Sequence, residues 1–145
     1  MSWEDLITYN TRKIAENPND DCAHYDRGWA YLQLEEYRKA VDDFNKAIAL
    51  KPDDSAAYTI RGWAYLALGE YENAIQDFNK VIEIYPEHEW AYNNRGLFYL
   101  ALKEYERAIQ DFNKVLTLNP EHSEAYEKRA KAYSKLPPRK QNLNQ

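Results

Sequence analysis

The chain repeats itself at an interval of 34 residues. The interval separates four prolines, three glycines and three phenylalanines: Pro18, Pro52, Pro86, Pro120, Gly28, Gly62, Gly96, Phe44, Phe78 and Phe112. A period of this length is typical of stacked supersecondary units, each of which packs on its neighbours. We therefore expect an array of small units rather than one domain built around a single core.

The composition excludes several classes of protein. With 145 residues, 44% hydrophobic and 30% charged, the chain is expected to be folded and soluble. Its net charge of −5 disfavours a nucleic-acid binder, which needs a basic surface. The single cysteine, Cys22, forms no internal disulfide and fits a reducing compartment. No signal peptide or membrane span is apparent, so we expect a cytoplasmic protein and no membrane partner.

Each unit contains two helical patterns separated by a short break. In residues 21–54, apolar side chains recur every three or four residues before and after the break at LEEY, 34–37. Pro52 ends the second helix, because proline disfavours helical geometry at the preceding residue. Asp53, Asp54 and Ser55 then supply side chains that suit the N-cap of the next helix.

The pattern resembles the tetratricopeptide repeat (TPR), whose unit is a pair of helices, A and B. The first unit supplies the small, aromatic and proline residues of the family: Gly28, Tyr31, Tyr37, Ala40, Phe44, Ala47 and Pro52. The next two units match in the same register, with Val81 and Val115 in place of the last alanine. The resemblance implies an all-α fold in which antiparallel helices stack into a right-handed TPR superhelix, an α-solenoid.

The register of the motif gives the organisation of the chain. Three full units occupy 21–122, as 21–54, 55–88 and 89–122. Residues 1–20 resemble a lone helix B in which Asn10 replaces the aromatic residue, and 123–136 resemble a lone helix A that caps the array. Residues 137–145 are polar, begin with two prolines, and are expected to form a flexible tail. We therefore expect about eight helices, with turns near 18–20, 52–54, 86–88 and 120–122.

Small and charged residues at fixed positions predict how the two helices of a unit meet. Gly28 and Ala40 allow the two helices to approach closely beside Phe44 and Tyr31. Phe78→Ala is expected to lower the free energy of unfolding by roughly 2–5 kcal/mol.

An arginine precedes each small residue of helix A and an aspartate precedes each phenylalanine of helix B: Arg27, Arg61, Arg95, Arg129, Asp43, Asp77 and Asp111. We expect Arg61 to bond Asp77 and its equivalents to pair likewise. The alternative is that the arginines bind an acidic ligand.

A second apolar stripe runs along the A helices, nearly opposite the core-facing stripe. In the first of them Tyr25, Trp29 and Leu32 fall at i, i+4 and i+7. The resemblance implies that such positions line a concave groove that holds ligands. The candidate groove residues are Tyr25, Trp29, Leu32, Thr59, Trp63, Leu66, Trp90, Asn93, Asn94, Leu97, Leu100, Lys128 and Lys131.

This groove is expected to hold an apolar or amphipathic segment of a protein or peptide partner, because exposed aromatic surface commonly marks an interaction site. Asn93 and Asn94 are candidates for hydrogen bonds to the partner's backbone, and Lys128, Lys131 and Lys135 for favouring acidic residues at one end. Two alternatives remain open. Trp29 and Trp63 can serve only to pack neighbouring A helices, or the groove can pair with another copy in a homo-oligomer.

The family's carboxylate clamp for chaperone tails does not carry over. Of the positions that it requires, only Asn94 and Lys128 are compatible in either register of the repeat. Binding of chaperone C-terminal tails is therefore not implied for this chain.

No pattern for catalysis, cofactor or metal emerges. His88 and His122 occupy equivalent turns without a second ligand at helical spacing, which favours solvated turn residues. Cys22 has no partner in a CxxC or adjacent histidine, and no phosphate-binding loop is present. We therefore expect no enzymatic activity and no cofactor.

The sequence predicts a non-catalytic protein–protein interaction module, acting as an adaptor, co-chaperone-like protein or assembly factor. A self-associating structural module is the alternative.

Overall fold

The computed structural model describes residues 1–138. Eight α-helices occupy this range: α1 (Trp3–Glu16), α2 (Asp21–Gln33), α3 (Tyr37–Leu50), α4 (Ser55–Ala67), α5 (Tyr71–Ile84), α6 (Glu89–Ala101), α7 (Tyr105–Leu118) and α8 (Ser123–Lys135). The described residues contain no strand. The predicted all-α fold and helix number are thus confirmed, and helices end shortly before each of the four prolines of the repeat.

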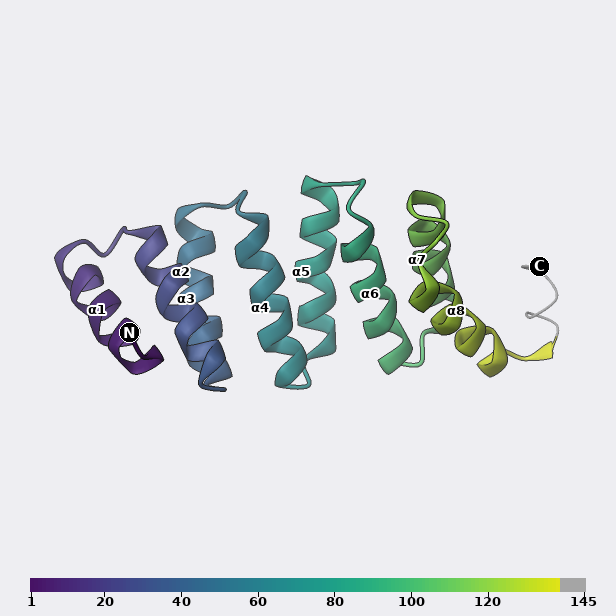
Figure 1. Cartoon of the computed structure of the whole chain (residues 1–145), viewed down its shortest axis with the longest axis horizontal. Coiled ribbons are helices and arrows are strands. Elements are labelled where there is room, and N and C mark those ends of the chain that lie inside the picture. The colour runs from purple at the N-terminus through teal and green to yellow at the C-terminus, as the bar shows by residue number, and fades with distance from the viewer. Residues whose placement is uncertain (139–145) are drawn as a thin grey trace. The chain divides into compact units, whose positions relative to one another are not determined.

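The helices form two compact units, each larger than one repeat: unit one, residues 1–84, and unit two, which begins at residue 85. In unit one, α1 to α5 pack in chain order, each helix against the next, and α2 also touches α4. In unit two, α6 packs on α7 and α7 on α8, while α6 also touches α8. Figure 1 shows that successive helices within each unit run in opposite directions. Each unit therefore contains helix pairs joined by tight turns.

The start of α4 carries the side-chain cap that the sequence predicts, and α2 starts in the same way. The side chain of Asp54 accepts hydrogen bonds from the backbone N–H groups of Ala56 and Ala57, at 3.1 and 3.3 Å. Asp20 accepts one from Ala23 at 3.0 Å in the same way. These carboxylates satisfy N–H groups that the first helical turn leaves without a partner.

The turn inside each pair requires one residue in the left-handed backbone region. Gly69 occupies it with φ 75°, whereas Glu35 and Lys103 occupy it with φ 60° and 61°. The following N–H returns to the helix, as in the 2.9 Å bond from Glu70 N to Tyr65 O. This geometry closes a helix C-terminus and directs the chain back along the first helix.

A glycine and a phenylalanine meet at the centre of each pair. A Cβ added to Gly62 would lie 2.9 Å from Cε2 of Phe78, and one added to Gly96 would lie 2.8 Å from Cε1 of Phe112. Both phenylalanines are fully buried. The predicted close approach is therefore present, and any larger residue at the glycine would displace the ring.

Arginine and aspartate form the predicted ladder across the pairs. Arg61 donates from Nε and Nη2 to the two carboxylate oxygens of Asp77, at 3.0 and 2.6 Å. The equivalent two-bond pairs join Arg27 to Asp43 and Arg95 to Asp111. Burial raises the pKa of Asp77, and the hydrogen bonds from Arg61 oppose that rise. The arginine therefore offsets part of the cost of burying the carboxylate.

The terminal helices differ from the repeats. In α1, Asn10 takes the place of the core aromatic and is buried; its Nδ2 donates to the carbonyl oxygen of Leu6 at 2.9 Å. At the other end, Pro137 and Pro138 are exposed, and the rest of the predicted flexible tail, residues 139–145, lies outside the described residues. No helix within residues 1–138 has the length and apolar character needed to cross a membrane.

Candidate functional site

The stripe of unit one comes from α2 and α4 and mixes exposed and half-buried side chains. Trp63 and Leu66 of α4 are 38% and 36% exposed, one turn apart on the same helix. Trp29 and Leu32 of α2 are half-buried and pack against the core cluster that contains Phe44. Equivalent positions thus differ: the α2 tryptophan contributes to packing, whereas the α4 tryptophan presents much of its ring to solvent.

Tyr25, a predicted groove residue, packs into the core of its own pair. Its ring meets Phe44 edge-on, with centroids 5.4 Å apart and an interplanar angle of 83°. Burial raises the pKa of the Tyr25 phenol. Thr59, at the equivalent position of α4, is half-buried. Tyr25 and Thr59 are therefore more enclosed than Trp63 and Leu66.

In unit two, the stripe residues of α6 are mostly covered. Asn93 is only 7% exposed, and its Oδ1 has no hydrogen-bond partner within the described chain. Asn94 donates from Nδ2 to the carbonyl oxygen of Trp90 at 2.9 Å, so part of its hydrogen-bonding capacity is used within α6. Leu97 and Leu100 are half-buried against the core cluster around Phe112.

The C-terminal part of the predicted groove forms a cavity of about 280 Å³ within unit two. Its lining comes from α6, from the first residue of α7 and from α8: Leu97, Leu100, Ala101, Tyr105, Lys128, Lys131 and Lys135. Lys128 is half-buried, whereas Lys131 and Lys135 are exposed. The structure therefore brings the predicted leucines and lysines together, and it adds Tyr105, which the stripe pattern did not include because it lies on a helix B.

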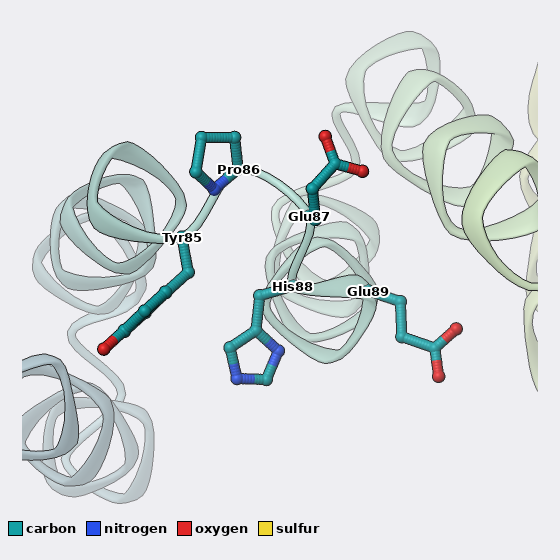
Figure 2. Close-up of a pocket in the computed structure, with 5 residues that line it drawn as sticks. All are labelled: Tyr85, Pro86, Glu87, His88 and Glu89. Atoms are coloured by element: carbon teal, nitrogen blue, oxygen red, sulfur yellow. The ribbon is translucent and has the colours of Figure 1, made fainter.

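A second cavity of about 400 Å³ lies at the turn before α6, lined by residues 85–89. Figure 2 shows Tyr85 and His88 on one side of this turn and Glu87 on the other. The His88 ring lies 6.4 Å from that of Tyr85 and 5.6 Å from that of Trp90, centroid to centroid. His88 thus belongs to a row of aromatic rings, which its polar sequence context did not indicate.

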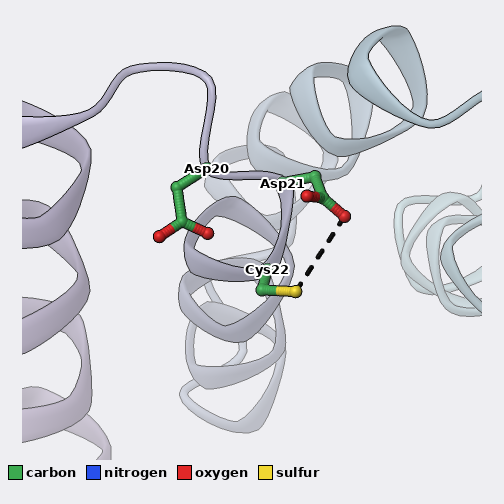
Figure 3. A group of neighbouring side chains, drawn as sticks. All are labelled: Asp20, Asp21 and Cys22. Carbon is green, nitrogen blue, oxygen red and sulfur yellow. Dashed lines mark hydrogen bonds between the residues drawn. The ribbon is translucent and has the colours of Figure 1, made fainter.

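Asp20, Asp21 and Cys22 bring three potential metal-ligand atoms together at the start of α2. Figure 3 shows the Cys22 thiol directed toward Asp21, with Sγ 3.9 Å from Oδ2. Asp20 already caps α2 through Ala23 and lies 3.7 Å from the Lys13 ammonium group. Capping and charge pairing account for the Asp20 carboxylate, and exposed acids at a helix start are common without a metal.

Two histidines have structural partners. His122 caps α8, its Nδ1 accepting a hydrogen bond from the N–H of Ala125 at 3.1 Å. Buried His24 is joined through Nε2 to the carbonyl oxygen of Pro18 at 2.9 Å. In the later repeats this bond is made by the hydroxyls of Tyr58 and Tyr92. The repeat alignment places His24 with these tyrosines and is the signal that reveals its role.

Comparison with known proteins agrees with the repeat geometry. Two models described as "Tetratricopeptide repeat" match residues 25–89 and 89–122, together more than half of the chain. No curated protein is significantly similar to it in sequence.

Several solved structures share the fold. MamA 41-end from Desulfovibrio magneticus RS-1 superposes with a TM-score of 0.84 at 23% identity, over 97% of this chain and 78% of that one. The Arabidopsis OM64 TPR domain gives 0.71 at 27% identity, over 80% and 96%. The second TPR domain of human RPAP3, in complex with the HSP70 peptide SGPTIEEVD, gives 0.68 at 28%, over 75% and 91%. With the paired helices, the glycine–phenylalanine contacts and both model matches, the chain belongs to the tetratricopeptide repeat family.

Proposed function

We propose that the chain is an adaptor or assembly factor that binds a segment of a partner protein on the aromatic stripe of the A helices. The observation that carries the proposal is the exposure of Trp63 and Leu66 on one face of α4, with the half-buried Trp29 at the position of α2 that is equivalent to Trp63. Tryptophan is a frequent anchor of protein interfaces because its large ring buries much area at little entropic cost.

The solved relatives support a peptide or protein as the partner. The second TPR domain of human RPAP3 is in complex with an HSP70 peptide, and the first TPR of Spaghetti (RPAP3) is bound to an HSP90 peptide at 27% identity to this chain. The chaperone tail itself is not proposed as the ligand, because only Asn94 and Lys128 are compatible with the clamp. A segment anchored by apolar side chains suits the exposed surface of α4 better.

The test compares Trp63→Ala with Trp3→Ala. Trp3 is a matched control because it lies in the same unit, on α1, and is 41% exposed against 38% for Trp63. We expect the wild type and Trp3→Ala to capture the same partner proteins from a native lysate. We expect Trp63→Ala to capture none of these partners. An anchor of this kind contributes about 2 kcal/mol, or about thirtyfold in Kd.

Circular dichroism checks that both variants are folded. Folded Trp63→Ala that retains every captured partner would disprove the proposal. Sedimentation over a range of concentrations separates the alternative, a self-associating module: there the wild type would form dimers or larger species, and Trp63→Ala would remain monomeric at the same concentrations.

A further inference from the structure

We infer that the cavity between α6 and α8 receives the acidic, leucine-bearing side of an amphipathic helix, so that it sets the chemistry of the partner. This inference rests on the proposed function and extends it to the second unit. The cavity volume of about 280 Å³ is at the lower limit of small-molecule pockets, about 300–1,000 Å³. It suits one or two inserted side chains better than a cofactor.

The floor and rim of the cavity differ in chemistry. Leu97 and Leu100 supply an apolar floor and are only half-buried, and Tyr105, also half-buried, lines the same cavity. An inserted apolar side chain would cover the remaining exposed surface of the two leucines, a favourable change because it removes apolar area from water. The floor therefore selects an aliphatic side chain.

The rim selects for negative charge. Lys128, Lys131 and Lys135 line the cavity along α8, and no acid in residues 1–138 lies within ion-pair distance of any of them. At a rise of about 1.5 Å per residue, the seven steps from Lys128 to Lys135 span about 10 Å along the helix axis. On a bound helix, carboxylates that lie one and two turns after a first carboxylate cover the same length. Each carboxylate would therefore lie opposite one of the lysines.

The repeat register shows that these charges are particular to this helix. Lys131 and Lys135 stand where α6 carries Leu97 and Ala101, and neither occupies a position of the carboxylate clamp. A capping helix needs a polar outer side, and Lys135 also suits the negative end of the α8 dipole. Neither requirement places Lys131 on the rim of an apolar cavity, in a chain whose net charge is −5.

The test uses a synthetic peptide of about 15 residues, acetylated and amidated so that it has no terminal carboxylate, with Leu and Glu at helical spacing. Two companion peptides replace every Glu by Lys or every Leu by Ser. Fluorescence anisotropy measures binding to the full chain. We expect the Leu/Glu peptide to bind at least about tenfold more tightly than either companion, and more weakly as salt rises.

The protein variants locate the binding. Lys131→Glu combined with Lys135→Glu is expected to weaken binding of the Leu/Glu peptide about tenfold or more. The matched control is Lys46→Glu combined with Lys51→Glu in unit one, which changes the net charge by the same amount. Lys51 is the C-cap of α3, so it lies at the end of its helix as Lys135 does in α8. The control pair is expected to bind as the wild type does.

Two binding results would overturn the inference, and one NMR result would do so as well. One is equal binding of the Leu/Glu and Leu/Lys peptides. The other is equal weakening by the two lysine pairs, since net charge rather than the cavity would then be responsible. Methyl NMR gives an independent reading, because shifts at Leu97 and Leu100 place the peptide in the cavity and unshifted methyls exclude it. Failure here is distinct from failure of the proposed function, which is tested at Trp63 in the other unit.

Discussion

Asp43→Ala is the substitution that best measures the arginine ladder. Asp43 is 4% exposed, and its two carboxylate oxygens accept hydrogen bonds from Arg27 at 2.8 and 2.7 Å. Removing one partner of a buried ion pair costs about 3–5 kcal/mol, because the other charge stays buried without compensation. The Arg27 side chain retains 21% exposure and a 3.1 Å bond to the Thr11 hydroxyl, which lower this cost. We therefore expect a loss of about 2–4 kcal/mol.

The neighbouring aspartate provides the control. Asp42 precedes Asp43 on α3 and is exposed, so Asp42→Ala changes the same chemical group on the same helix without touching a buried pair. The gain in helix propensity on replacing Asp by Ala applies to both variants and cancels in the comparison. We expect Asp42→Ala to stay within about 0.5 kcal/mol of the wild type.

Urea denaturation followed by far-UV circular dichroism measures the difference. Because repeat arrays unfold as coupled local units, the shift of the midpoint is compared between the two variants rather than converted from one curve alone. A double-mutant cycle with Arg27→Ala isolates the pair and is expected to show a coupling of about 1–3 kcal/mol. If Asp43→Ala is no more destabilising than Asp42→Ala, the ladder is a solvated contact and the reasoning is refuted.

Two further predictions concern the glycine contacts and the charge of the ladder. Gly62→Ala is expected to destabilise by about 1–3 kcal/mol, since the added Cβ would lie 2.9 Å from the Phe78 ring; thermal unfolding checks this, and an unchanged or raised Tm contradicts it. Arg61→Ala removes the hydrogen bonds that oppose the raised pKa of Asp77, so that pKa rises further above its unfolded value. A raised carboxyl pKa means that the native state binds the proton more tightly than the unfolded state does, so raising the pH destabilises the variant. The difference in free energy of unfolding between the wild type and Arg61→Ala should therefore be smallest near pH 4 and increase toward pH 7. Urea midpoints of wild type and variant across that range test the sign, and a deficit that shrinks as pH rises would be the opposite of this expectation.

Much of the fold follows from the sequence because every repeat makes the same local choices. Each of the four repeat prolines follows the end of a helix, and an aspartate before α2 or α4 caps that helix through its own side chain. The spacing of glycine and phenylalanine predicted the close contact inside each pair, and the arginine–aspartate register predicted that Arg61 bonds Asp77, which the structure shows as a two-bond ion pair. These features need only one helix pair, so the repeat pattern contains all the information that they require.

The candidate site depends on neighbours that no single repeat specifies. Trp29 and Trp63 occupy the same repeat position, yet Trp29 packs on the core cluster around Phe44 while Trp63 stays exposed. Asn93 has the polarity of a groove residue but is buried, because exposure depends on the side chains of adjoining helices. The sequence determined which helices form and how each pair closes. Only the tertiary structure decided which faces remain uncovered and brought Lys131 into the lining of one cavity with Leu97 and Leu100, because exposure and cavities arise from packing between pairs.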